Sequence, residues 1–264
     1  MKVLIVPDED TGAVLAADLI RELVDELPNA ILGFATGSTP EPLYAELAAR
    51  SDRGLDLRGV HGFLLDEYVG LAAGHPQSYR QVIRREVSDR LGLDAAQISG
   101  PDGSALDLHS AARRYEQEIC TVGGVDLQIL GLGGNGHIGF NEPGSPFNSR
   151  TRVVTLTEQT RTDNARFFGG KVDSVPTHAI TQGLATISSA RRLVLLAWGE
   201  HKAEAAAQSI EGEMTERWPA TMLQMHPDVT MILDHAAATL LHDTGIASLG
   251  SMHEIPDAGS CSRV

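Results

Sequence analysis

The sequence contains very little cysteine and no long apolar run. Its 264 residues include only Cys120 and Cys261, too few for a disulfide framework and without the spacing of a metal site, so a reducing setting is expected. No window approaches the ~20 consecutive apolar residues that a membrane helix requires. The short apolar N-terminus is followed by acidic residues, which does not match a signal peptide. We therefore expect a cytoplasmic protein that does not associate with membranes.

Positive charge is also scarce. Lys occurs only at positions 2, 171 and 202, and 21 Lys and Arg residues stand against 35 Asp and Glu residues, for a net charge of −14. A surface of this sign repels a phosphate backbone, which excludes a general nucleic-acid-binding protein. A small anion needs only one local cationic pocket, so such a ligand remains compatible with the charge.

Short apolar runs alternate with amphipathic helical patterns along the chain. Continuous apolar strands separated by helices are typical of a parallel sheet that is covered on both faces. We therefore predict one α/β domain over residues 1–243 and a loose Gly- and Ser-rich tail over 244–264. Irregular alternation between residues 66 and 125 leaves an eight-stranded barrel as the alternative. Asp10 or Thr11 is expected to cap the first helix. The expected strands are 3–6, 31–35, 63–65, 125–130, 153–156, 193–197 and 229–233, and the expected helices are 10–27, 40–50, 78–91, 106–120, 158–168, 179–186 and 202–210.

The first polar loop follows the second predicted strand and reads Ala-Thr-Gly-Ser-Thr-Pro over residues 35–40. Ligands of an open parallel sheet bind beyond the carboxyl ends of its strands, where this loop would lie. Thr39 and Pro40 have the form of an N-cap followed by a first-turn proline. Free helix amides and three hydroxyls suit a phosphate, although an ordinary strand-to-helix turn explains the same residues.

Two adjacent acids, Asp66 and Glu67, directly follow the third predicted strand. Drawing both carboxylates into the crevice is costly, so one of them is expected to have a role. A carboxylate in that place can act as a general base on a carbon acid. The alternative is a solvated loop in which an acid caps a helix.

The third polar loop, residues 133–144, is rich in glycine. The glycine spacing over 131–136 fits the dinucleotide-binding pattern in number, but His137 follows at once and Asn-Glu-Pro at 141–143 interrupts the helix that such a turn begins. The sequence favours a His packed beside an amide and a carboxylate, with Glu142 fixing the tautomer of His137. A structural His satisfied by the backbone is the alternative.

Together these loops resemble those of the glucosamine-6-phosphate deaminases, also called the glucosamine-6-phosphate isomerase family. The likeness covers residues 1–240 in order. It implies a three-layer α/β fold on a modified Rossmann-like, mostly parallel sheet, and the conversion of glucosamine 6-phosphate and water to fructose 6-phosphate and ammonia. The matching segments are TGSTP at 36–40, LDEYVGL at 65–71, NGHIGFNEPG at 135–144, SRTR at 149–152, TR at 160–161, NARFF at 164–168 and LQMHP at 223–227.

The resemblance also implies roles for individual residues. Asp66 is the acid/base that moves a proton between C2 and C1, and His137 is the acid/base that opens the sugar ring. Glu142 and Asn135 are the partners that support His137. Because some members carry Asp at the position of Asn135, the pKa of His137 is expected to be less raised here than in those members. The implied phosphate-binding residues are Thr36, Gly37, Ser38, Thr39, Arg166 and Lys202.

The reaction implied by the resemblance needs a small-molecule sugar phosphate and no metal or other cofactor, and a homo-oligomer is compatible with it. Hexameric members are activated by N-acetylglucosamine 6-phosphate through a Ser, an Arg, a Lys, a Thr and a tail Tyr. Here Ser145, Arg152 and Thr155 match, but Val154 replaces the Lys and no Tyr follows residue 243. We therefore expect no such activation.

Two other functions are compatible with the same fold. A 6-phosphogluconolactonase shares the Gly-His loop, but that family lacks both the Asn-Glu-Pro run and the Asp-Glu-Tyr-Val-Gly-Leu block. A non-enzymatic sugar-phosphate sensor would need a DNA-binding helix pair, for which the chain has neither ~60 spare residues nor a basic patch. The sequence thus favours the deaminase.

Overall fold

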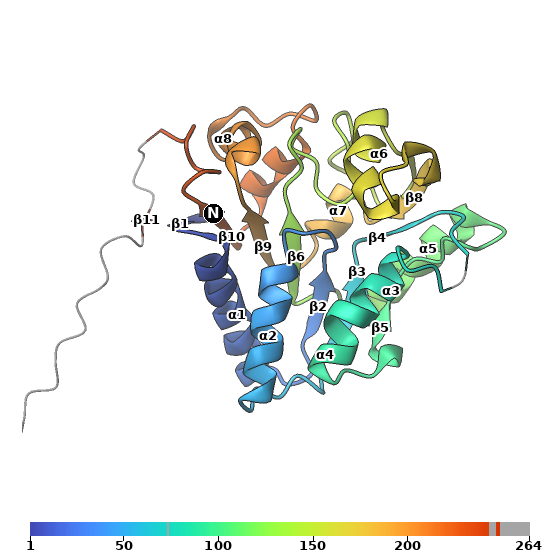
Figure 1. The fold of residues 1–264 in the computed structure, drawn as a ribbon, viewed down its shortest axis with the longest axis horizontal. Helices are drawn as coiled ribbons and strands as arrows, with labels where there is room; N and C mark the ends of the chain where they lie inside the picture. The colour runs from blue at the N-terminus through green and yellow to red at the C-terminus, as the bar shows by residue number, and fades with distance from the viewer. Residues whose placement is uncertain (73, 243–246, 249–264) are drawn as a thin grey trace, which may run out of the picture.

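A parallel eight-stranded sheet forms the centre of the fold in this computed structural model, which describes residues 1–72, 74–242 and the backbone of 247–248 (Figure 1). Its inner strands are buried on both faces, which explains their continuous apolar sequences. The strands lie in the order β11 (Ala247–Ser248), β1 (Lys2–Val6), β10 (Val229–Asp234), β9 (Arg192–Ala197), β6 (Leu127–Gly131), β2 (Ile31–Phe34), β3 (His61–Leu64) and β5 (Ile98–Ser99). The predicted three-layer α/β class is confirmed. The barrel alternative is wrong, because β11 and β5 lie at opposite edges of an open sheet.

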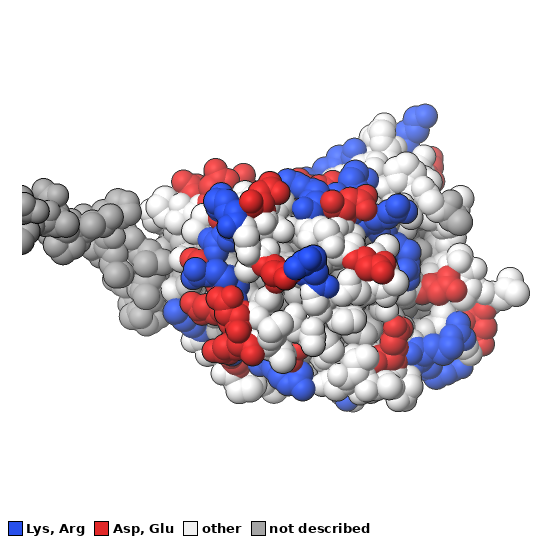
Figure 2. All heavy atoms as spheres, turned by 90° about the horizontal axis from the view of Figure 1, so that it is seen from below, with Lys and Arg blue, Asp and Glu red and all other residues white. Residues whose placement is uncertain are grey.

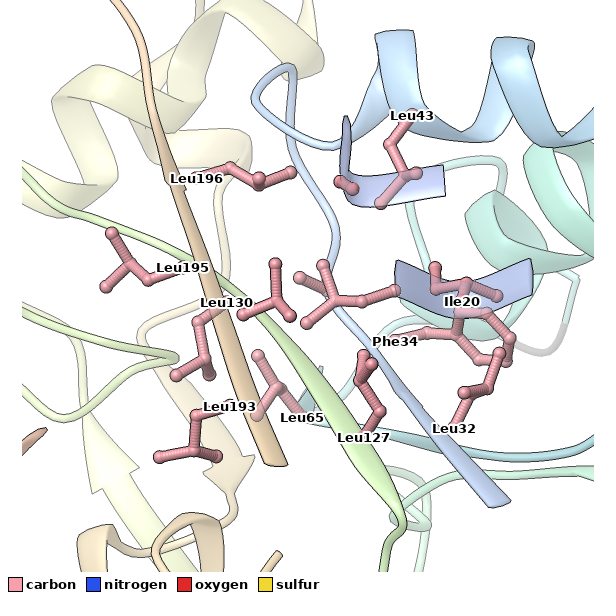
Figure 3. Packing of buried hydrophobic residues seen from close by; sticks show 14 of the residues in the cluster. Ile20, Leu32, Phe34, Leu43, Leu65, Leu127, Leu130, Leu193, Leu195 and Leu196 are labelled. Carbon is pink, nitrogen blue, oxygen red and sulfur yellow. The ribbon is translucent and has the colours of Figure 1, made fainter. Parts of the chain in front are cut away.

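Helices cover the sheet and bury its side chains. Ile20 of α1 (Glu9–Glu26) and Leu43 of α2 (Glu41–Asp52) pack into one core with Leu32, Phe34 and Leu127 (Figure 3). The other α-helices are α3 (Tyr79–Ile83), α4 (Asp89–Leu91), α5 (Leu108–Thr121), α6 (Glu158–Asn164), α7 (Leu184–Ile187) and α8 (Ala203–Glu211), with a π-helical turn at Arg84–Ser88 and 3-10 turns at Ala95–Gln97, Ala165–Phe168, Val172–Ser174, Glu200–Lys202 and Pro219–Met225.

Two predicted helix caps are wrong. The side chain of Asp8, not that of Asp10 or Thr11, caps α1 by accepting a hydrogen bond from the Thr11 backbone N–H. Helix α2 begins after Pro40 and has no side-chain cap, so Thr39 does not serve as one. The hydroxyl of Thr39 is therefore not engaged in capping the helix.

A second, antiparallel sheet contains β4 (Asp66–Tyr68), β8 (His178–Thr181) and β7 (Arg152–Thr155). The predicted helix over 179–186 is wrong, because β8 occupies its first half and α7 its second. Helix propensity is a weak prior, and here the buried position between β4 and β7 outweighs it. This sheet turns the chain just after β3, so that Asp66 begins β4 beside the central sheet.

The surface carries acidic and basic side chains in close alternation on the face that Figure 2 shows. Of the helices in the described ranges, none has the length and apolar character to cross a membrane. The tail predicted over 244–264 lies outside the described residues, except that Ala247 and Ser248 pair with β1.

Candidate active site

A cavity of about 460 Å³ opens at the carboxyl ends of the central strands. The loops that follow β2, β3 and β6 meet there, as the rule for parallel sheets predicts. Of the ten predicted site residues, Asn135 and Glu142 do not line this cavity. The eight that line it are Thr36, Gly37, Ser38, Thr39, Asp66, His137, Arg166 and Lys202.

Asp66 is a buried carboxyl group on the cavity wall, with 5% of its surface exposed. Burial, with the nearby charge of Glu67, raises its pKa to about 8, while a hydrogen bond from the Phe140 backbone N–H works in the opposite direction. The loop that carries His137 passes close by. A Cβ on Gly139, which has a φ of +56°, would lie 3.3 Å from the carboxyl oxygen of Asp66. Glycine therefore permits this approach.

Glu67 has a structural role, although it is adjacent to Asp66. Its carboxylate accepts hydrogen bonds from the backbone N–H groups of Tyr79 and Arg80, both at 3.0 Å, and from the hydroxyl of Ser78 at 2.7 Å. These groups lie at the start of α3, where free amides need acceptors. The alternative of an acid that caps a helix thus applies to Glu67, although Glu67 is buried in β4 and not in a solvated loop. The role of Asp66 as a general base stays a prediction.

The side chains of His137, Asn135 and Glu142 form a chain of contacts. Its Nδ1 lies 2.7 Å from Oδ1 of Asn135, and Nδ2 of Asn135 donates to Oε2 of Glu142 at 2.9 Å. The sequence suggested a direct contact between Glu142 and His137. Glu142 instead lies 3.8 Å from Nδ1 of His137 and contacts it through Asn135. Because a carboxylate only accepts, the Asn135 amide must turn its NH₂ to Glu142 and its oxygen to the imidazole. This arrangement places the proton of neutral His137 on Nδ1 and leaves Nε2 as an acceptor.

Burial lowers the pKa of His137 below its ordinary value. The charge of Glu142 raises this pKa and that of Lys202 lowers it, but the loss of hydration is the largest effect. The expected difference from members with Asp at position 135 stays a prediction; in this chain the pKa of His137 lies below its ordinary value because burial outweighs the carboxylate. A neutral imidazole at physiological pH can accept a proton.

Two cations, Arg166 and Lys202, also line the cavity. The guanidinium of Arg166 lies 3.4 Å from the hydroxyl of Ser38, and Lys202 precedes α8 directly. Burial, with the repulsion of Arg166, lowers the pKa of Lys202. Neither cation has a carboxylate within ion-pair distance in the described part of the chain. Together with the hydroxyls of residues 36–39 on the same cavity wall, these two cations suit an anion.

Sequence reasoning missed several residues of this wall. The hydroxyl of Tyr79 donates to that of Tyr68 at 3.3 Å, and Nδ2 of Asn164 donates to the same oxygen at 3.0 Å. Thr160 and His201 also line the cavity. Tyr68, Thr160 and Asn164 lie inside the segments that match the deaminase family, and this match could have indicated them as site residues. Tyr79 and His201 lie outside those segments, so nothing in the sequence indicated them.

Comparison with known proteins agrees with this geometry. The family model described as glucosamine-6-phosphate isomerases/6-phosphogluconolactonase matches residues 9–232. Glucosamine-6-phosphate deaminases of Beutenbergia cavernae and Mycolicibacterium smegmatis are 55% and 54% identical, each match covering 91% of this chain and 93% of the relative.

Solved structures extend the comparison. A monomeric glucosamine-6-phosphate deaminase is 42% identical with a TM-score of 0.89, over 91% of this chain and all of that one. A 6-phosphogluconolactonase from Leishmania guyanensis shares the fold at 21% identity and a TM-score of 0.71, over 89% of this chain and 97% of that one. The chain therefore belongs to the family of glucosamine-6-phosphate isomerases and 6-phosphogluconolactonases.

Proposed function

We propose that this protein is a cytoplasmic glucosamine-6-phosphate deaminase, which converts glucosamine 6-phosphate and water to fructose 6-phosphate and ammonia. One observation carries the proposal: a single cavity is lined by a buried carboxyl group, a neutral imidazole and two cations, Arg166 and Lys202. The deaminases at 53–55% identity support the same substrate. The position of these residues in the cavity supports the role proposed for each of them.

His137 opens the sugar ring. The cyclic sugar has no acidic C2 proton, so the aldehyde must form first. Nε2 of His137 accepts the proton of the C1 hydroxyl and returns it to the ring oxygen, which breaks the bond between C1 and that oxygen. Asn135 and Glu142 hold the imidazole in the tautomer that this step needs.

Asp66 moves the proton between the two carbons. As a carboxylate it takes the C2 proton of the open aldehyde and returns a proton to C1, which leaves an imine at C2. Water then adds to the imine and releases ammonia and the ketose. The cationic amine of the substrate favours the ionised form of Asp66, which opposes the effect of burial on its pKa.

The two cations of the cavity bind the phosphate, which aligns the carbon chain. Lys202 and Arg166 supply charge, and the loop of residues 36–39 supplies hydroxyl groups and backbone amides. Binding energy distant from the reacting carbons is thus used to place C1 and C2 against both acid/base groups.

Release of ammonia from glucosamine 6-phosphate tests the proposal directly. The purified protein is expected to release one ammonia for each fructose 6-phosphate formed. The same preparation is also given 6-phosphogluconolactone, with loss of the lactone followed above its spontaneous hydrolysis. Turnover of the lactone without ammonia release would assign the chain to the lactonase branch, and inactivity on both would favour a sensor.

We predict hyperbolic kinetics, without activation by N-acetylglucosamine 6-phosphate. The guanidinium of Arg152 donates to Oδ1 of Asn141 at 2.8 Å and to the hydroxyl of Ser145 at 3.1 Å, and Val154 adds no second cation. An activator must bind one state of the protein more tightly than the other, and a phosphate needs free donors for that. Substrate saturation curves with and without the compound at millimolar concentration are the measurement. A sigmoidal curve that becomes hyperbolic on its addition would contradict the prediction.

A further inference from the structure

The hydroxyl of Thr160 lies next to Glu142, the carboxylate that supports His137 through Asn135. It donates a hydrogen bond to Oε1 of Glu142, and the hydroxyl of Thr157 lies 3.2 Å from the same oxygen. Thr160 has 5% of its surface exposed, and the side chain of Glu142 has 12%. A buried carboxylate oxygen is costly without donors, so these hydroxyls decide where the carboxylate rests.

The position of this carboxylate determines the orientation of an amide. Oε2 of Glu142 accepts from Nδ2 of Asn135, whose Oδ1 then accepts from the backbone N–H of His137 at 3.2 Å and meets its Nδ1 at 2.7 Å. If the carboxylate moved away, the amide could rotate and offer its NH₂ to the imidazole. His137 would then carry its proton on Nε2, the nitrogen that the ring-opening step needs as an acceptor.

We propose that Thr160 is a positioning residue, whose hydroxyl fixes the tautomer of His137 through Glu142 and Asn135. Thr160 belongs to α6, and the 3-10 turn that follows this helix carries Arg166. One short helical segment therefore carries both Thr160 and the cation proposed to bind the phosphate. The effect on turnover rests on the proposed function, whereas the tautomer does not.

The tautomer is measured by two-bond ¹H–¹⁵N correlation spectra of the histidine rings, at a pH where His137 is neutral. The signals of His137 are those that disappear in His137→Gln. We expect a single Nδ1–H tautomer in the wild type and in Thr160→Ser, and a mixture or the Nε2–H form in Thr160→Val. Unchanged ring signals in Thr160→Val would overturn the proposal, even in a protein that releases no ammonia.

Kinetics provide the second measurement. Thr160→Val is expected to lower kcat about tenfold or more with a KM within about twofold, because valine keeps nearly the size of the threonine side chain on the cavity wall and removes only the hydroxyl that donates to Glu142. Thr160→Ser, which keeps the hydroxyl, is expected to retain more than half of kcat. Thr162→Val makes the same change at an exposed position of α6 and is expected to match the wild type.

Three kinetic outcomes would overturn the proposal: wild-type turnover in Thr160→Val, a change in KM alone, or an equal loss in Thr160→Ser. The last would mean that the side chain acts by packing and not through its hydroxyl. If Thr160→Val does not fold, judged by circular dichroism, Thr160→Ala takes its place. That variant lacks the hydroxyl and introduces no new atoms, and the same outcomes apply to it.

Discussion

Asp66→Asn is expected to lower the turnover of glucosamine 6-phosphate by about 100-fold or more, with the fold and substrate binding retained. The amide keeps the shape of the side chain but cannot take the C2 proton. Asp66 lines the cavity, and burial holds its pKa near 8, in the range where a base can take and return a proton. Initial rates at saturating substrate give the loss in kcat. Binding of the product fructose 6-phosphate, which competes with the substrate, is measured separately and reports whether the site still binds.

The control for Asp66→Asn is Asp173→Asn, the same change at an exposed position outside the cavity. It should leave turnover unchanged. An Asp66→Asn variant that keeps more than a tenth of wild-type turnover would remove Asp66 from the proton transfer. A comparable loss in the control would point to a general effect of charge.

The pH dependence of activity follows from the same carboxyl group. The free enzyme needs Asp66 ionised and His137 neutral, and the pKa of His137 is already lowered by burial. The value of kcat/KM is therefore expected to rise with pH through about 8, where Asp66 loses its proton. A profile recorded from pH 5.5 to 9.5 tests this. A rise that is complete below pH 6 would exclude the raised pKa.

Stability is expected to depend on pH in the opposite direction. Folding raises the pKa of Asp66 to about 8. The contribution of this carboxyl group to the free energy of unfolding is therefore fully present below its unfolded pKa of about 4, and it is lost as the pH rises towards about 8. Asp66→Asn removes this penalty. Its Tm should exceed that of the wild type at pH 8, and the difference should shrink as the pH falls towards 4. A lower Tm at pH 8 would mean that Asp66 stabilises the fold.

The sequence predicted the sheet because its inner strands are apolar on both sides and helices separate them. The same reasoning failed over 179–186, where the chain enters the small antiparallel sheet. Local pattern could not show that Ala179 and Ile180 would be buried between β4 and β7. Burial there is a tertiary effect, and it determined the outcome.

Sequence reasoning found the cavity-lining residues that follow strand ends, and it missed those that meet their partners only in space. Asp66 and His137 follow two strands of one sheet, so their meeting could be expected from the sequence. The contact of Asn164 with Tyr68 joins residues 96 positions apart, and that of Thr160 with Glu142 joins residues 18 positions apart. Side chains that work through such contacts leave no local pattern. The structure is therefore needed to find them.

His137→Gln is expected to separate ring opening from enolisation. Glutamine has no side-chain group that accepts and returns a proton at neutral pH, so turnover of the cyclic substrate should fall by about 100-fold or more. Asp66 remains buried on the cavity wall, and the proposed mechanism assigns proton transfer at C2 to Asp66 and not to His137. The variant should therefore still exchange the C2 proton of an acyclic analogue with solvent deuterium, at a rate close to that of the wild type.

Two assays on the same His137→Gln preparation decide the division of roles, with Asp66→Asn as the reciprocal control. Ammonia release from the cyclic substrate reports the whole reaction, and deuterium uptake by the acyclic analogue reports enolisation alone. Asp66→Asn should fail in both assays, because the proposed mechanism assigns the proton transfer at C2 to Asp66 and to no other group described on the cavity wall. An equal loss of both activities in His137→Gln would mean that the imidazole also takes part in proton transfer at carbon. The tautomer held by Asn135 would then serve both steps, since Nε2 is the one ring nitrogen left free to accept a proton.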